Sequence, residues 1–263
     1  MKILVKSDDY GFTKGVTDGI VDAMRNGIIT CTGLFANMPA APYAVSKMAE
    51  FPNVCFGIDI NIVSGPSILG KDEIPTLIDD HGEFIRSTVK YKDPRYVKGG
   101  ENEELWPYDE CFKEACAQVE KYIELVGKKP EYITTHSIGA AAGAYVRALS
   151  DVAKKYELPF AREVFAEYGF FALPSLNVKP FTMENQLASD VEGNTLKMLE
   201  AHKDKELVNI GGHGGFVDDE LLKYSTYTLI RAKDHAMYTS EKVKQWIKDN
   251  NAELITFRDI LKK

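Results

Sequence analysis

The sequence predicts an α/β protein with a parallel sheet, either closed into a barrel or open and covered by helices on both faces. Short segments rich in apolar and β-branched residues alternate with amphipathic helical segments almost throughout the chain. Polar residues follow several of the predicted strands directly, as they do in parallel α/β enzymes. The length of 263 residues suits one (β/α) barrel, since such barrels commonly reach about 250 residues.

The first half of the chain repeats the order strand, polar loop, helix. Each predicted strand is short and apolar, and each predicted helix repeats apolar residues every three or four positions. The clearest amphipathic stripe ends before Gly127 and Pro130, two residues that stop helices. In chain order we expect a strand at 2–6, a helix at 16–24, a strand at 28–37, a helix at 42–50, a strand at 54–63 and a helix at 112–126.

The second half continues the same alternation. Its strands are short, and its last predicted helix carries Val243, Trp246 and Ile247 on one face. We expect strands at 132–135, 159–162, 207–210 and 253–257, and helices at 144–156, 227–238 and 241–250.

Two long stretches interrupt the alternation, at 64–106 and 163–184, and both contain helix-breaking Gly or Pro residues. Loops longer than about 15 residues are unusual in compact domains and often bind ligands or cover a site. No linker, repeat or low-complexity tract separates the chain into parts. We therefore predict one domain over 1–263 with two long excursions.

Composition excludes several classes of protein. The chain is 44% hydrophobic and 27% charged, and its net charge of -7 comes without a basic stripe, so nucleic acid is not an expected partner. No run of about 20 apolar residues predicts a membrane span, and the opening segment turns acidic too early for a signal peptide. We expect a cytoplasmic protein. Cys31, Cys55, Cys111 and Cys116 lack CxxC spacing and are expected to be reduced core residues.

Four groups of polar residues stand on or directly after predicted strands, where parallel α/β enzymes build their active sites. Adjacent carboxylates point in different directions, so one can bind a metal while the other takes a proton. Two carboxylates and one imidazole suit Mg²⁺, Mn²⁺, Zn²⁺ or Fe²⁺. The candidates are Asp8 and Asp9, Asp59 and Asn61, His136, and His213 within Gly-Gly-His-Gly-Gly.

Each candidate also has a purely structural interpretation. Asp8 and Asp9 could form an Asx turn closed by Gly11, Asp59 could lie on the wet face of a strand, and the glycines around His213 could simply make a flexible loop. His81, His202 and His235 lack a comparable context and are set aside, the last two as surface residues.

The motifs resemble those of one family over nearly the whole chain. Ser-Asp-Asp-Tyr-Gly-Phe-Thr-Lys-Gly at 7–15, with Gly-Ile-Ile-Thr-Cys-Thr at 27–32 and Asn37, is similar to the Asp-Asp-Phe-Gly opening and second strand of the YdjC-like carbohydrate deacetylases, which include chitooligosaccharide deacetylases. Further blocks resemble that family at 57–65, at 129–136, at His213 with Asp218, and along Tyr227, Arg231, Tyr238, Thr239 and 257–259.

This resemblance implies a deformed TIM-like (β/α) barrel of the glycoside hydrolase/deacetylase type, often a homodimer, that removes acetyl groups from N-acetylated sugars with a divalent metal. By position, Asp9, Asp59 and His136 would hold the metal. Asp8 would act as general base on the attacking water and His213 as general acid on the departing amine. Contacts with the carbohydrate are assigned to Asn61, Arg162 and Asp218.

The chain departs from the family pattern at several positions. Asp59 replaces a metal-binding His, Thr134 replaces an Asp, and Ser137-Ile138 replace further His residues. A carboxylate in place of an imidazole favours a harder ion, so Mg²⁺ is the predicted metal, with Zn²⁺, Mn²⁺ and Fe²⁺ as alternatives. Gly214 stands where the family has Pro and is expected to loosen the His213 loop.

Three functions remain open at this point. The leading one is metal-dependent deacetylation of an N-acetylated sugar or a small oligosaccharide, with or without a phosphate group. The second is hydrolysis of a phospho-disaccharide, as in cellobiose-phosphate cleavage, by the carboxylates of Asp8 and Asp59. The third is a sugar-binding relative that has lost turnover because of the substitutions at Asp59, Thr134 and Ser137.

Overall fold

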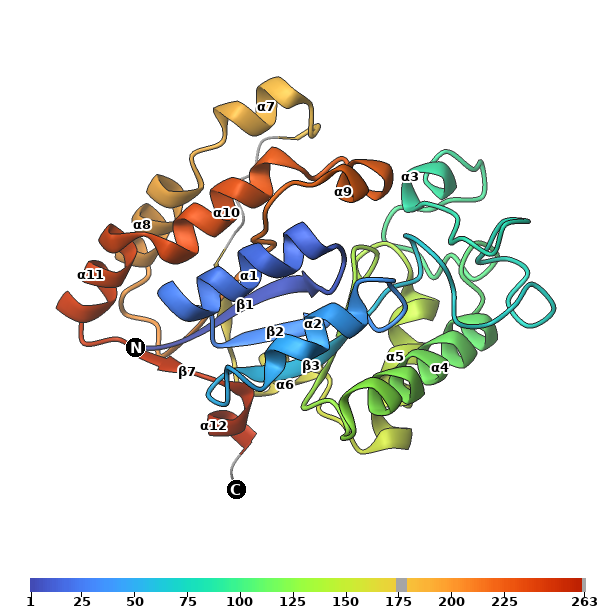
Figure 1. The fold of residues 1–263 in the computed structure, drawn as a ribbon, viewed down its shortest axis with the longest axis horizontal. Helices are drawn as coiled ribbons and strands as arrows, with labels where there is room; N and C mark the ends of the chain where they lie inside the picture. The colour runs from blue at the N-terminus through green and yellow to red at the C-terminus, as the bar shows by residue number, and fades with distance from the viewer. Residues whose placement is uncertain (174–178, 262–263) are drawn as a thin grey trace.

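The computed structural model describes residues 1–173 and 179–261, and it places a curled parallel sheet at the centre of the molecule (Figure 1). The strands follow the order β4-β3-β2-β1-β6-β5, with β7 also paired to β1, and every pairing between strands is parallel. The strands are β1 (Lys2–Tyr10), β2 (Cys31–Leu34), β3 (Cys55–Ile60), β4 (Ile133–Thr135), β5 (Phe171–Ala172), β6 (Leu207–Gly212) and β7 (Glu253–Ile255).

Helices connect these strands and cover the outside of the sheet, which confirms the predicted α/β class (Figure 1). They are α1 (Lys14–Asn26), α2 (Ala41–Met48), α3 (Ser87–Lys90), α4 (Tyr108–Val126), α5 (Gly143–Tyr156), α6 (Ala161–Glu167), α7 (Met183–Ala188), α8 (Val191–Ala201), α9 (Asp219–Tyr224), α10 (Leu229–Thr239), α11 (Glu241–Asp249) and α12 (Phe257–Leu261).

The sheet is an incompletely closed barrel. β1 lies at its centre. Two strands pair with the same edge of β1: β7 pairs with Lys2–Leu4, and β2 pairs with the segment from Lys6 onward. β6 pairs along the other edge. Within the described residues no pairing joins β4 to β5, so the predicted deformed barrel is confirmed as a curled half-barrel, whereas full closure is not observed.

Several predicted elements differ from those observed. The strand expected at 159–162 is a single parallel bridge from Phe160 to Ile133, because helix α6 already begins at Ala161. Helix α12 replaces the end of the strand expected at 253–257. Six of the described helices, α3, α6, α7, α8, α9 and α12, were not predicted. Helix α8 shows why, since Thr195 and Leu199 are its buried residues and they leave almost no apolar stripe.

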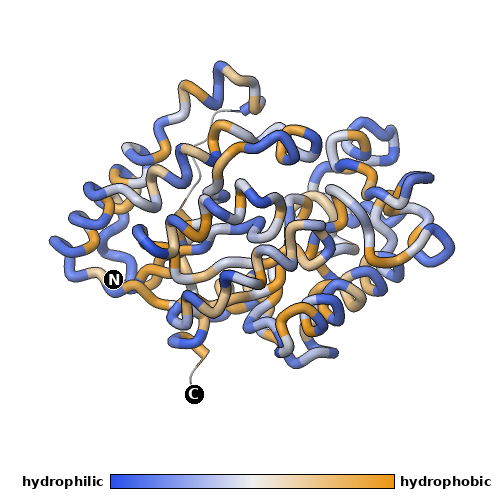
Figure 2. The backbone as a smooth tube through the Cα atoms, in the orientation of Figure 1, coloured by the Kyte–Doolittle hydropathy of each residue, from blue (hydrophilic) through white to orange (hydrophobic). Residues whose placement is uncertain are grey.

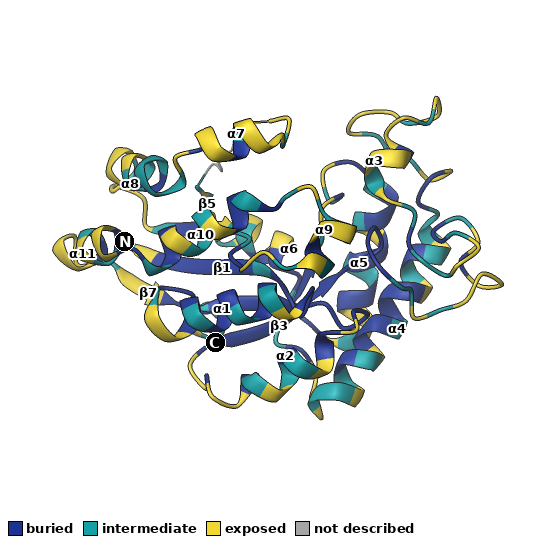
Figure 3. Cartoon of the chain, turned by 45° about the horizontal axis from the view of Figure 1, so that its top comes forward, coloured by how far each residue is buried: buried dark blue, intermediate teal, exposed yellow. Residues whose placement is uncertain are grey.

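The core lies between the sheet and the helices. Strands β1 and β3 are buried along nearly their whole length, whereas α7 and α11 turn exposed residues outward (Figure 3). The outer helices alternate hydrophobic and hydrophilic residues along their length, as one-sided packing requires (Figure 2). All four cysteines are buried and free, as predicted.

The excursion at 64–106 is irregular but packed. Apart from the short helix α3 it forms turns, and Ile74, Leu77 and Trp106 are fully buried. The buried carboxylate of Glu114 on α4 accepts hydrogen bonds from the backbone N–H groups of Ile68 and Leu69, both at 3.0 Å. This excursion is therefore a fixed wall beside the sheet.

The excursion predicted at 163–184 is more regular than expected. It includes the end of α6, strand β5 and the start of α7, while 174–178 lie outside the described residues. None of the helices in the described part of the chain is long and apolar enough to cross a bilayer.

Candidate active site

Strand β1 ends in the two adjacent carboxylates. Asp9 has a φ of 71°, a left-handed conformation that is unusual for a residue other than glycine. Asp8 and Asp9 consequently meet different partners: Asp8 lies beside Lys6, and Asp9 lies beside Arg231 and His136. The predicted division of labour between the two carboxylates is consistent with this geometry.

Asp9 is fully buried between Arg231 and His136. Its Oδ2 accepts a hydrogen bond of 2.6 Å from Nη2 of Arg231, and its Oδ1 lies 3.0 Å from Nδ1 of His136. Burial by itself would raise the pKa of Asp9, but Arg231 and His136 outweigh it and hold the pKa well below its usual value. Asp9 is therefore ionised at neutral pH.

Asp59 on β3 is equally buried but has no such support. Neither of its carboxylate oxygens has a hydrogen-bond partner among the described residues. Burial, reinforced by the nearby charge of Asp8, raises the pKa of Asp59 well above its usual value. A buried carboxylate without partners is costly, and a bound cation would supply what it lacks.

His136 follows β4 and completes a cluster. Its backbone N–H donates to the carbonyl of Ile60 at 3.2 Å, and the edge of its ring packs against Phe35 with centroids 4.7 Å apart. Burial lowers the pKa of His136, but Asp9 raises it by more, so the net shift is upward. Ligand atoms of Asp9, Asp59 and His136 all lie within 4.8 Å of one another, so these residues fit a divalent metal.

Lys6 is a buried cation that was not predicted as part of the site. Its Nζ lies 3.0 Å from Oδ1 of Asp8 and donates a hydrogen bond of 3.2 Å to Oγ1 of Thr134. Burial lowers the pKa of Lys6, but Asp8 and Asp59 raise it by more. Strand alternation could have revealed it, because Lys6 and Asp8 stand two residues apart and share a face of β1.

The loop that carries His213 is held on both sides. The backbone N–H of His213 donates to Oδ2 of Asp234 at 2.8 Å, and the N–H of Gly214 donates to Oγ of Ser7 at 3.0 Å. A Cβ at Gly214 would come within 3.0 Å of the ring of Tyr238. The expectation that Gly214 loosens this loop is therefore wrong, since the glycine lets the loop pack closely.

Asp234 on α10 is a second residue that was not predicted. It is buried, and its Oδ2 also accepts a hydrogen bond from the hydroxyl of Tyr227 at 3.0 Å. The rings of Tyr227 and His213 pack edge to face with centroids 5.1 Å apart. Helical spacing offered a signal, because Arg231 and Asp234 stand three residues apart on one face of α10.

The three residues predicted to bind substrate have structural partners. Asn61 is buried, and its amide accepts from the N–H groups of Val63 and Ser64, both at 3.1 Å. Asp218 caps α9 and also accepts from the N–H of Gly15 at 2.6 Å, which ties the His213 loop to α1. Arg162 is exposed and donates to the carbonyl of Gly139 at 2.9 Å. Their role toward a substrate stays a prediction.

One remaining histidine also differs from expectation. His235 is not a free surface residue, because its Nε2 lies 2.7 Å from Oδ2 of Asp22 and its side chain is 17% exposed. This Asp–His pair joins α10 to α1 away from the cluster and offers a natural control for it.

A cavity of about 530 Å³ opens onto the cluster. Asp9, His136 and His213 line it, whereas Asp8 and Asp59 are not among its lining residues. Both long excursions contribute to its wall. The contributions from 64–106 include Arg86, Ser87, Thr88 and Tyr91, and those from 163–184 are Lys179 and Phe181.

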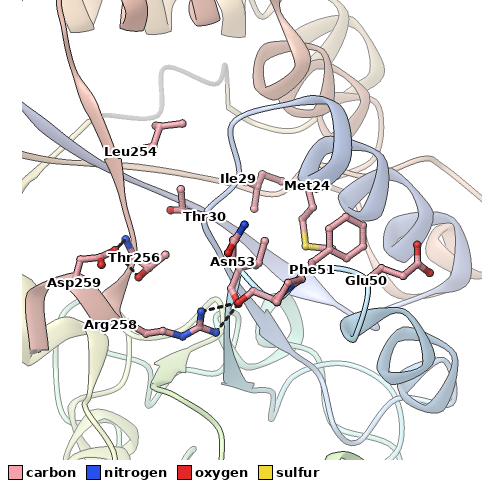
Figure 4. Close-up of a pocket in the computed structure, with 12 residues that line it drawn as sticks. Met24, Ile29, Thr30, Glu50, Phe51, Asn53, Leu254, Thr256, Arg258 and Asp259 are labelled. Carbon is pink, nitrogen blue, oxygen red and sulfur yellow. Dashed lines mark hydrogen bonds between the residues drawn. The ribbon is translucent and has the colours of Figure 1, made fainter.

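A second cavity of about 530 Å³ lies at the opposite ends of the strands (Figure 4). Its most prominent polar group, Arg258, is already engaged, since it pairs with Glu131 and donates to the carbonyls of Pro52 and Val54 at 2.9 and 2.7 Å. In parallel barrels this end of the strands contributes stability, whereas the other end carries the chemistry. The cluster at the carboxyl ends is therefore the candidate active site.

Comparison with known proteins identifies the family of the chain. The sequence model of the YdjC-like protein family matches residues 2–249, so the chain belongs to that family, as its motifs predicted. Relatives include carbohydrate deacetylase 2 of Listeria innocua, 28% identical over the full length of both chains, and a carbohydrate deacetylase of Thermoanaerobacter pseudethanolicus, 28% identical over 99% of each.

Two solved structures share the fold. One is a proposed cellobiose-phosphate cleavage protein of Enterococcus faecalis V583, with a TM-score of 0.78, 22% identity and 98% of each chain covered. The other is a family 4 acetyl xylan esterase of Clostridium thermocellum in complex with a cobalt ion, with a TM-score of 0.52 and 10% identity over 99% of this chain and 90% of that one. These likenesses confirm the deformed barrel.

Proposed function

We propose that this protein removes the acetyl group from an N-acetylated sugar or small oligosaccharide, using a divalent metal held by Asp9, Asp59 and His136. The chain is an enzyme of the carbohydrate-deacetylase class, which is the class of its family and of its named relatives. The observation that carries the proposal is the convergence of these three residues beside a cavity that His213 also lines, with neither Asp59 oxygen hydrogen-bonded to any described residue.

A divalent metal in this cluster would polarise the acetyl carbonyl and make a water molecule more acidic. The chain's own residues supply the remaining steps. Asp8 takes the proton from the attacking water, and His213 protonates the departing amine. Asp234 and Ser7 hold the backbone on either side of His213, so its ring is presented from a fixed loop.

The cavity wall supports a carbohydrate substrate. Tyr91, Phe181 and Tyr227 provide ring surface suited to the apolar face of a sugar. Arg86 and Lys179, both exposed, add positive charge at positions contributed by the two excursions. We therefore extend the proposal to a small oligosaccharide that carries a negative group such as phosphate. A homodimeric assembly and a cytoplasmic location stay predictions.

The test measures acetate and free amine released from an N-acetylglucosamine disaccharide, with and without a phosphate. We expect release that stops with a chelator and returns with Mg²⁺, Mn²⁺ or Zn²⁺. Asp9→Ala and His136→Ala should abolish it, whereas Asp22→Ala, which breaks the Asp–His pair outside the cluster, should leave it within about twofold. Acetate release that survives metal removal would refute the mechanism.

A second candidate function follows from the fold neighbour whose name refers to cellobiose-phosphate cleavage. Such cleavage needs two carboxylates that flank the scissile bond. Asp8 and Asp59 are the carboxylates available, but the Asp59 carboxylate converges with Asp9 and His136 in one compact cluster instead of facing Asp8 across the cavity, so the geometry favours deacetylation. Formation of monosaccharides without acetate would reverse this preference, and tight sugar binding without either product would indicate a relative that has lost turnover.

A further inference from the structure

We propose that Lys6 is a built-in positioning residue of the site: it orients Asp8 and offsets the charge of the carboxylate cluster, in competition with the metal. The inference rests on the proposed function for the role of Asp8 as general base. Its charge-balancing part concerns metal binding alone and can be tested without any substrate.

The geometry places the Lys6 ammonium inside the curl of the sheet. Lys6 starts from β1, and its Nζ reaches Thr134 on β4, three strands away in the order β4-β3-β2-β1. It lies between that hydroxyl, at 3.2 Å, and Oδ1 of Asp8, at 3.0 Å. Its side chain is only 9% exposed, so solvent does little to screen the ion pair.

The same contacts bring the ammonium close to the metal ligands. Thr134 is the register partner of Asp59 on the neighbouring strand, so the hydrogen bond to Thr134 holds Lys6 beside Asp59 as well as Asp8. Arg231 is already committed to Asp9 through its 2.6 Å hydrogen bond. Lys6 is thus the cation that faces the other two carboxylates.

The two roles predict opposite effects when Lys6 is removed: turnover should fall, and metal binding should become tighter. Without the ammonium, Asp8 loses its 3.0 Å ion pair and is no longer held for proton transfer, so turnover falls. The carboxylates also lose a competing positive charge, so a divalent cation binds more tightly. A lysine that merely supported the fold would not improve metal binding when it is removed.

The experiment compares the full-length wild type with Lys6→Met, Lys6→Arg and Lys2→Met, where Lys2 is an exposed lysine on the same strand. Calorimetry with Mn²⁺ alone on metal-free protein gives Kd, and acetate release gives kcat and KM. For Lys6→Met we expect Mn²⁺ binding to tighten about tenfold and kcat to fall about 10- to 100-fold with KM unchanged. Lys6→Arg should restore most of the wild-type Kd for Mn²⁺ and most of the wild-type kcat, and Lys2→Met should change neither value.

Equal or weaker Mn²⁺ binding by folded Lys6→Met would overturn the charge-balancing role, and an unchanged kcat would overturn the positioning role. If wild type releases no acetate, the proposed function fails, while the Mn²⁺ titration still decides the charge balance. If Lys6→Met does not fold, Thr134→Val replaces it: loss of the hydroxyl that orients the ammonium should lower kcat with little change in Kd, and wild-type kcat would overturn the proposal.

Discussion

Asp59→Asn should make the metal-free protein more stable while it weakens metal binding. Asp59 is fully buried, and neither oxygen has a hydrogen-bond partner in the described part of the chain. Asparagine has the same shape without the charge, and its amide N–H groups can donate to a neighbouring carboxylate. The exchange therefore removes a buried charge that has no hydrogen-bond partner among the described residues, at almost no cost in packing.

The expected gain in the free energy of unfolding is about 1 to 3 kcal/mol at pH 7, the usual penalty for a buried polar group without partners. In a chain of this size that corresponds to a rise in Tm of about 2–4 °C per kcal/mol. The gain should depend on pH. Because the pKa of folded Asp59 is raised, the native state holds its proton longer than the unfolded state, so wild-type stability falls as pH rises from about 4. The stability of Asp59→Asn should not fall in this way, because asparagine has no proton to lose.

The assay is thermal and urea unfolding of metal-free wild type and variant between pH 4 and 8, repeated with Mn²⁺. We expect wild type to gain about 2.7 kcal/mol at a hundredfold excess of Mn²⁺ over Kd, and Asp59→Asn to gain far less. Asp218→Asn is the matched control, since its carboxylate accepts two backbone hydrogen bonds and the exchange should lower stability. A metal-free Asp59→Asn that is less stable than wild type would refute the reasoning.

Three further predictions concern stability. Asp218→Ala should lower the free energy of unfolding by about 1 kcal/mol, seen as a lower Tm, because α9 loses its cap. Glu131→Gln should destabilise the protein at pH 7, and urea titrations should show the gap closing as pH falls below 4.5, because Arg258 holds the pKa of Glu131 low against the effect of burial. Burial lowers the pKa of Lys90 to about 8 from 10.5, so the unfolded chain holds this proton at a higher pH than the native state does. The free energy of unfolding of wild type relative to Lys90→Met, measured with urea, should therefore increase as the pH is raised from about 8 to 10.5.

The sequence predicted the sheet, half of the described helices and a cluster of polar residues at the strand ends, because these depend on local pattern. Apolar periodicity marks strands and helices, and polar residues after parallel strands meet at one end of the sheet. This pattern indicated Asp59, His136 and one of the two adjacent carboxylates, the family resemblance selected Asp9, and the structure brings the ligand atoms of these three residues within 4.8 Å of one another.

Residues defined by tertiary contact were harder to predict. Lys6 belongs to the site only because the sheet curls enough to bring β1 within reach of Thr134 on β4. Asp234 matters because α10 packs against the His213 loop. Neither relation has a fixed spacing in sequence, since the paired residues stand 128 and 21 positions apart. For the same reason the sequence left open whether the sheet closes, because strand count and curl are properties of the whole sheet.

Stability and chemistry lie at opposite ends of these strands. At the carboxyl ends, Asp9 and Ser137 are held at positive φ, each at a cost of about 1–3 kcal/mol, and Asp59 adds an unpartnered buried carboxylate. At the amino ends, Arg258 and Glu131 satisfy one another and the neighbouring carbonyls. These costly features thus collect around the proposed metal ligands, where a cation would offset the buried charge of Asp59, so metal binding should raise the free energy of unfolding of this protein.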